Sequence, residues 1–211
     1  MNRTSTVIVS LIGIVVIAAG VWFVIFKNKA PETPVVVTPP VATSTAQTYA
    51  STTLGISLQY PQGYTVDENY AYGQFGPNKL IHGVSFTIPQ AMATGTNLSS
   101  DTYVSVEQLP NAKNCTGDIF LQANVKPMDV TDGGIDYSVA SSTDAAAGNR
   151  YEEWVYALVG SKPCTAVRYF IHYGVIDNYP PGTVNDFNRD ALISDFDSIR
   201  HSLIVTPATT P

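Results

Sequence analysis

Residues 151–173 read YEEWVYALVGSKPCTAVRYFIHY. This stretch is rich in valine, tyrosine and other β-branched or aromatic residues, which are the types enriched in β-strands. Gly160-Ser161-Lys162-Pro163 interrupts it with a short turn sequence, which predicts antiparallel neighbours over Tyr151–Val159 and Cys164–Tyr173. A third strand is predicted at Ile135–Ala140, directly after a Gly-Gly turn. The three strands are therefore expected to form a meander.

Further strands and one helix extend this pattern in both directions. Alternating apolar residues predict strands at 56–60, 83–88 and 103–108, and a weak helical signal lies at 118–123. Near the C-terminus, apolar residues recur at helical spacing and share one face: Leu192, Phe196, Ile199 and Leu203. Thr183 and Asp186 resemble a capping box at the start of that helix. An antiparallel sheet packed by a C-terminal helix gives an α+β domain over residues 49–205.

Length and charge restrict the class of protein. The chain has 211 residues, of which 45% are hydrophobic and 13% charged, so it has room for one ordinary domain with appendages. Its net charge is −6, and residues 49–211 alone carry eight basic and sixteen acidic side chains, a net charge of −8. Such acidity argues against binding to nucleic acid. It would suit a cationic partner, although it would also serve solubility alone.

The segment before the domain has the character of a membrane anchor. Residues 6–26 contain no charge, and a helix of 21 residues is about 31 Å long, enough to cross the hydrocarbon core of a bilayer. The apolar run is longer than that of a cleaved signal peptide, which favours an uncleaved anchor after a short tail of residues 1–5. Cleavage near Val21 is the alternative.

A Pro/Thr-rich linker, residues 27–48, follows the anchor, and residues 206–211 form a similar flexible tail. Four prolines between Pro31 and Pro40 exclude a helix and favour an extended stalk. Positive charges on the two sides of residues 6–26 nearly balance, so they do not decide the orientation. The stalk and the even number of cysteines favour a single-pass protein of the cell membrane whose C-terminal domain is extracytoplasmic.

The two cysteines, Cys115 and Cys164, are predicted to form a structural disulfide. Two buried free thiols would be the better interpretation in a cytoplasmic domain, but the anchor reverses that preference. Each cysteine lies at the boundary of a predicted element, where a cross-link would not distort a core. The absence of a Cys-x-x-Cys motif argues against redox catalysis.

No motif with catalytic, cofactor-binding or metal-binding spacing was found. His82, His172 and His201 fit no metal-ligand pattern, and structural or surface roles are expected for them. Glu152 and Glu153 are adjacent on a strand, so they must point to opposite faces and cannot act as a pair. Two further sets of polar residues invite a functional interpretation. Asp129, Asp132 and Asp136 lie near two glycines and weakly suggest a calcium-binding site. Asn97 and Asn114 each begin a sequence that fits the N-glycosylation pattern.

Two short segments resemble those of a known family. Residues 55–64, GISLQYPQGY, resemble the opening strand and turn of PsbP-like domains, and residues 196–203, FDSIRHSL, resemble their closing helix. Tyr64 stands where such domains often have tryptophan, and Arg200 where an apolar residue is common. The resemblance implies a fold found in envelope proteins, and an accessory or binding role without a catalytic centre.

Three functional hypotheses follow. The first is a membrane-anchored extracytoplasmic domain that binds or supports another envelope component, without cofactor. The second is an envelope hydrolase with dispersed active-site residues, which would require a cleft that brings His172 or His82 to a carboxylate. The third is an acidic inhibitor of a cationic envelope enzyme.

Overall fold

A computed structural model describes residues 46–206. The predicted anchor, most of the predicted linker and residues 207–211 lie outside this range. Within it, no helix has the length and apolar character required to cross a membrane. Strand β1 begins at Ala46, before the domain boundary expected at Tyr49.

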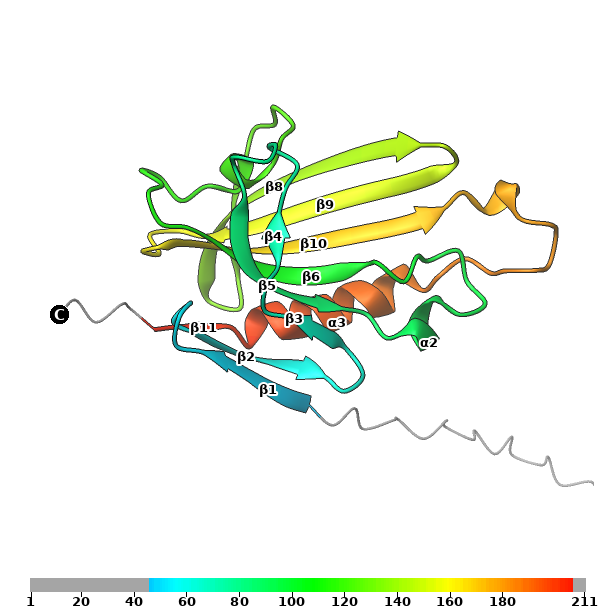
Figure 1. Cartoon of the computed structure of the whole chain (residues 1–211), viewed down its shortest axis with the longest axis horizontal. Coiled ribbons are helices and arrows are strands. Elements are labelled where there is room, and N and C mark those ends of the chain that lie inside the picture. Colours follow the sequence, from blue (N-terminus) through cyan, green and yellow to red (C-terminus); the bar gives the residue numbers. More distant parts are fainter. Residues whose placement is uncertain (1–45, 207–211) are drawn as a thin grey trace, which may run out of the picture. The chain divides into compact units, whose positions relative to one another are not determined.

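A large antiparallel sheet forms the centre of the fold (Figure 1). In order across the sheet, its strands are β3 (Thr65–Asp67), β5 (Ile81–Thr87), β6 (Tyr103–Leu109), β10 (Cys164–Gly174), β9 (Asn149–Leu158), β8 (Ile135–Ala146) and β7 (Met128–Asp132). A short strand, β4 (Ala71–Tyr72), also pairs with β5. The predicted meander is confirmed, because β8, β9 and β10 are consecutive antiparallel neighbours.

Helix α3 (Arg189–His201) covers one face of this sheet, as the sequence predicted. A second sheet, formed by β1 (Ala46–Ser51), β2 (Ile56–Pro61) and β11 (Ile204–Val205), packs through β2 on α3. Phe196 of α3, Tyr169 of β10 and Leu58 of β2 belong to one hydrophobic cluster. The chain is therefore an α+β domain in which α3 is shared between two sheets.

The start of α3 differs from the prediction. The helix begins at Arg189, and its N-cap is Asn188, whose Oδ1 accepts a hydrogen bond from the amide of Ala191 at 3.0 Å. Thr183 is not a cap, since its hydroxyl donates to the carbonyl of Pro180. The predicted start at Thr183 is therefore wrong. Pro, Gly and Asn residues form a turn before the helix, and Asn188 caps it because asparagine is at least as good an N-cap as threonine.

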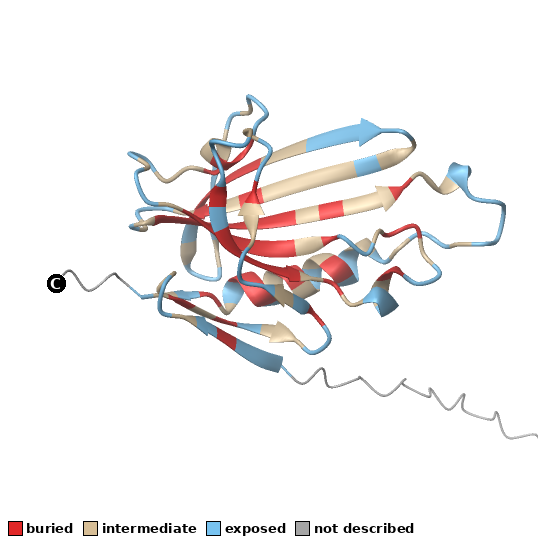
Figure 2. Cartoon of the chain, in the orientation of Figure 1, coloured by how far each residue is buried: buried red, intermediate tan, exposed pale blue. Residues whose placement is uncertain are grey.

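The other face of the large sheet is only partly covered. The covering elements are β4 and the 3₁₀-helix η1 (Gly117–Phe120), which replaces the longer helix predicted at 118–123. Two short elements lie elsewhere: α2 (Gln90–Ala93) and η2 (Ile176–Asn178). Figure 2 shows that β8 becomes exposed toward its C-terminal end, where this face is open. We call it the open face below.

Candidate ligand-binding site

Strand register places polar and aromatic side chains in rows on the open face. Ser142 of β8 lies opposite Glu153 of β9, which lies opposite Phe170 of β10. Two residues further along each strand, Asp144 lies opposite Tyr151. Because side chains alternate along a strand, all five of these residues project from the same face of the sheet.

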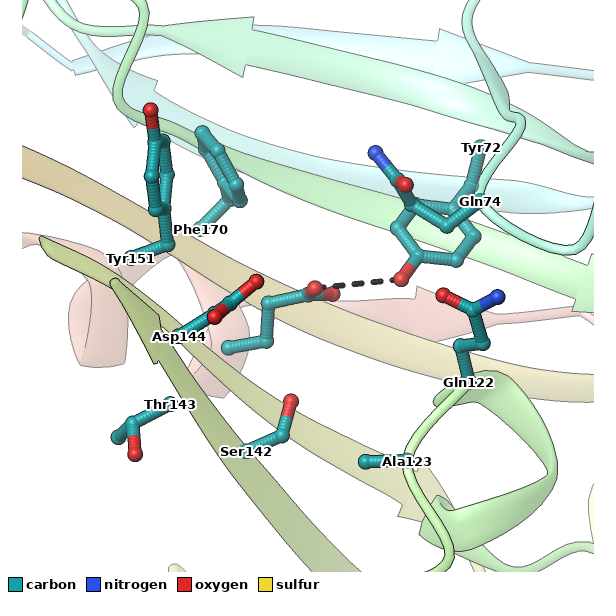
Figure 3. A pocket seen from close by; sticks show the side chains of 10 residues that line it. Tyr72, Gln74, Gln122, Ala123, Ser142, Thr143, Asp144, Tyr151 and Phe170 are labelled. Carbon is teal, nitrogen blue, oxygen red and sulfur yellow. Dashed lines mark hydrogen bonds between the residues drawn. The ribbon is translucent and has the colours of Figure 1, made fainter. Parts of the chain in front are cut away.

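A cavity of about 470 Å³ lies over these rows, and we call it the Glu153 pocket. Its volume falls within the range of small-molecule sites. It is lined by Tyr72, Gln74, Gln122, Ala123, Ser142, Thr143, Asp144, Tyr151, Glu153 and Phe170. Figure 3 shows Tyr151 and Phe170 on one side and Tyr72, Gln74 and Gln122 on the other, with Asp144 directed between them.

A buried arginine lies beneath the pocket and holds Glu153 in place. The Arg168 side chain is fully buried; its Nη1 donates to Glu153 Oε2, and its Nη2 donates to the carbonyl of Phe120 at 2.7 Å. The hydroxyl of Tyr72 donates to Glu153 Oε1 at 3.2 Å, which is the dashed line in Figure 3. The Arg168 guanidinium also lies over the Tyr72 ring, 3.6 Å from its centroid.

The charge of Arg168 is shared with a second carboxylate. Its Nε and Nη2 donate to the two oxygens of Glu107, at 2.7 and 2.9 Å, and the Glu107 side chain is fully buried. Ser105 and Tyr70 also donate to Glu107, at 2.8 and 2.9 Å. Burial strongly raises the pKa of Tyr70 and raises that of the neighbouring Tyr103 to about 12, so both phenols stay protonated.

Three features hold η1 against the open face beside the pocket. The Cys115–Cys164 disulfide, with an S–S distance of 2.11 Å, joins the segment before η1 to the first residue of β10. Gly117 lies directly on the sheet, since a Cβ there would come within 2.7 Å of the Ala140 amide nitrogen. Arg168 binds the carbonyl of Phe120 at the end of η1. Gln122 and Ala123, which follow at once, form a wall of the pocket.

The rings of Tyr151 and Phe170, across the pocket from Gln122, are each supported by another ring. Tyr151 stacks on His172 with ring centroids 4.4 Å apart, and Phe170 stacks on Tyr103 with centroids 4.9 Å apart. Tyr151 and Phe170 are themselves 6.2 Å apart. The pocket therefore presents aromatic surface of fixed orientation, together with carboxylates, amides and a hydroxyl. Among the described residues, no group of three or more His, Cys, Asp or Glu side chains could hold a metal ion.

The disulfide predicted between Cys115 and Cys164 is present. The prediction for the glutamates is confirmed as well, because they face opposite sides. Glu152 binds Arg189 and accepts from Tyr173, whereas Glu153 binds Arg168 and lines the pocket.

The other predicted polar residues lie outside the pocket. Asp132, which suggested calcium, instead accepts from Arg200 Nη2 at 2.5 Å and from His201 Nε2 at 2.9 Å. Asp197 of α3 accepts from Tyr169 at 2.7 Å and from Arg200 at 2.9 Å. Asn97 of the first sequon is buried and bonded to the carbonyl of Gly174, so its amide is not accessible for glycosylation.

Sequence reasoning missed Arg168, Glu107 and the role of Glu153. The first two stand inside mostly apolar strands, in a chain in which only 13% of residues are charged. Charged residues are almost never fully buried unless they are paired, so this combination could have indicated an internal ion pair. It could not have indicated the partners, because Glu107 and Arg168 are 61 residues apart.

Comparison with known proteins identifies no family. No family model and no curated protein matches the chain. A protein of Bacteroides thetaiotaomicron, known from a crystal structure at 1.50 Å resolution, aligns with 78% of this chain and 50% of its own, at 12% identity and a TM-score of 0.44. This chain therefore spans about half the length of that protein.

The solution structure of CyanoP, the PsbP protein of the cyanobacterium Synechocystis, aligns with 82% of this chain and 100% of its own, at 14% identity and a TM-score of 0.32. The structural neighbours thus include a PsbP domain. These values carry no inference about function, and membership of the PsbP-like family stays a prediction.

Proposed function

We propose that this protein is a binding module held at the outer surface of a membrane, and that the Glu153 pocket is its ligand site. The anchor and the outward orientation come from residues 1–48 and from the cysteine count. The observation that supports a ligand site is the set of ion pairs that Arg168 forms with Glu107 and Glu153, which we call the Arg168 network. This network holds Glu153 rigidly at the floor of an open cavity.

The energetic cost of this network favours a functional interpretation. Burial of an ion pair is usually no more stabilising than apolar packing of the same volume, so the sheet did not require charge here. What the network provides is a carboxylate of fixed position, half-buried in a concave surface. Rigid, partly buried polar groups in a pocket are what a selective small-molecule site needs.

The hydrolase alternative is less well supported. His172 Nδ1 lies 2.8 Å from Asp101 Oδ1, but its Nε2 is buried without a hydrogen-bond partner, so no substrate could reach it. His82 and Glu68 line another hollow, of about 570 Å³, and both are exposed. Among residues 46–206 no hydrogen bond joins His82 to Glu68, so His82 is not oriented as a general base would be.

The test is ligand screening with a variant whose pocket is filled. Saturation-transfer NMR of the full-length chain in a non-ionic detergent would be run against a library of small polar compounds. Ser142→Trp places an indole opposite Glu153. Ala145→Trp is the matched control, because Ala145 is exposed on the same strand, is absent from the pocket lining, and alternates with Asp144, so its side chain projects from the opposite face of the sheet.

We expect at least one compound to bind the wild type and the Ala145→Trp variant but not the Ser142→Trp variant, with similar melting temperatures for all three. If every compound that binds the wild type also binds Ser142→Trp, the pocket is not the ligand site. If none binds the wild type, the proposal is equally wrong.

A further inference from the structure

The Glu153 pocket carries an excess of negative charge. Arg168 is the only cation in its network and faces two carboxylates, of which Glu107 takes two of its hydrogen bonds. The network therefore has a net charge of −1, and Glu153 is its member that reaches the pocket. Asp144, which is exposed on the pocket wall, adds a second negative charge.

None of the ten residues that line the pocket is basic. Arg150, which directly precedes the lining residue Tyr151, lies on the other face of β9, because its side chain alternates with those of Tyr151 and Glu153. A cation that entered the pocket would thus meet two carboxylates at short range without competition from a lining lysine or arginine. In a half-enclosed site such attraction is several times stronger than in open water.

The aromatic rings favour an organic cation over a metal ion. Tyr151 and Phe170 present π-faces beside Glu153, and such faces attract ammonium groups within about 6 Å of the ring centroid. Hard metal ions instead require several oxygen ligands, and among the described residues no group of three or more His, Cys, Asp or Glu side chains could hold one. Each ring is backed by a stacked neighbour, so the surface is preorganised.

We propose that the Glu153 pocket binds an organic cation through an alkylammonium group seated against Glu153 and beside Tyr151 and Phe170. This inference rests on the proposed function and names its ligand class. The cation could be a free small-molecule ammonium compound or a lysine side chain of a partner protein, and in both cases the carboxylates and the rings would recognise its positive charge.

Two pairs of probes separate charge from shape. Choline is compared with 3,3-dimethylbutan-1-ol, which replaces the charged nitrogen by carbon. Nα-acetyl-lysine amide is compared with Nα-acetyl-norleucine amide, which lacks the ammonium group. Affinities are measured by calorimetry on the full-length chain. We expect each cation to bind at least about tenfold more tightly than its neutral counterpart. The tighter of the two cations identifies the source.

Three variants locate the bound charge. Asp144→Asn removes an exposed carboxylate outside the Arg168 network, so we expect the variant to fold like the wild type. We expect it to lose cation affinity several-fold. Glu153→Gln keeps an acceptor for Arg168 and is expected to lose about tenfold or more. Asp129→Asn, on β7 and outside the pocket lining, makes the same change in net charge and is expected to have no effect.

The outcomes distinguish this inference from the proposed function. If the neutral counterparts bind as tightly as the cations, and both lose affinity in Ser142→Trp, the pocket binds ligands but does not select cations. If the cations bind Ser142→Trp as they bind the wild type, they do not occupy the pocket and the inference is wrong. If neither cation binds at millimolar concentration, the inference is also wrong, and the library screen decides separately on the proposed function.

Discussion

Arg168 shows how one buried residue can support both stability and the site. Replacing it by methionine would leave Glu107 fully buried without its cation and would free Glu153. Because an unpaired buried charge is costly, we expect Arg168→Met to lower the free energy of unfolding by about 3–5 kcal/mol. Urea denaturation followed by tryptophan fluorescence measures this change.

Arg150→Met is the matched control, since Arg150 is exposed and binds only a neighbouring carbonyl. A change within about 0.5 kcal/mol is expected there. If Arg168→Met proved as mild as Arg150→Met, Glu107 would have to be readily neutralised or rehydrated, and the network would not hold Glu153 in the way proposed.

Single residues also show the limits of prediction from sequence. The opposite directions of Glu152 and Glu153 followed from strand periodicity alone, since that periodicity is a local property. The partners of Asp132 and Asp197 did not follow, because Arg200 reaches them only after α3 has packed on the sheet. Solvated and ion-paired carboxylates have the same sequence pattern.

At the scale of elements, the disulfide fixes η1 and thus a wall of the Glu153 pocket. It closes a loop between residues 49 positions apart, so replacing both cysteines by serine should lower the free energy of unfolding by about 4 kcal/mol in the chain-entropy model. Urea denaturation of the double variant checks this value.

A second measurement locates the effect of the cross-link. Faster amide hydrogen exchange at residues 116–123, with little change in β9, is expected in the double variant, because the disulfide is the covalent attachment of this segment to β10, whereas β9 is paired with strands on both sides. Uniform loss of protection over the whole domain would contradict a local role in the pocket wall.

The turn between β7 and β8 is attached to the end of α3 by ion pairs at Asp132. The hydrogen bond from Arg200, and then that from His201, lowers the pKa of Asp132 from 3.8 to about 2. A carboxyl group whose pKa is lower in the folded state stabilises the fold above its ordinary pKa, and this stability is lost as the pH falls toward the lower value. The window is therefore about pH 4 to 2.

We expect Asp132→Asn to flatten the acid dependence of stability in that window, measured as the urea midpoint against pH. The wild type should lose stability more steeply than the variant as the pH falls. Asp129→Asn, an exposed change on the same strand, is the control and should follow the wild type. Parallel curves for Asp132→Asn and the wild type would show that the ion pair is too well screened to contribute.

For the whole molecule, the sequence predicted what is local and left open what is distant. The β8–β9–β10 meander has short connections, and the apolar face of α3 repeats at helical spacing, so both could be predicted. The pairing of β10 with β6 joins residues about sixty positions apart, and no sequence pattern indicates which strands pair over that distance. The Glu153 pocket depends on that pairing and on η1, which explains why it could not be predicted.

The proposed location depends on residues 6–26 as an uncleaved anchor. If they span the bilayer, the full-length protein should stay in the membrane fraction after an alkaline carbonate wash, because a helix of 21 uncharged residues buries its whole surface in lipid. The double variant Ile14→Arg and Val16→Arg places two charges at the centre of the segment, at a cost of about 2.5–3.5 kcal/mol each on the insertion scale. It should therefore appear in the soluble fraction with its original N-terminus. Release of the wild type with a new N-terminus near Val21 would instead show cleavage, and the domain would act as a secreted binding protein.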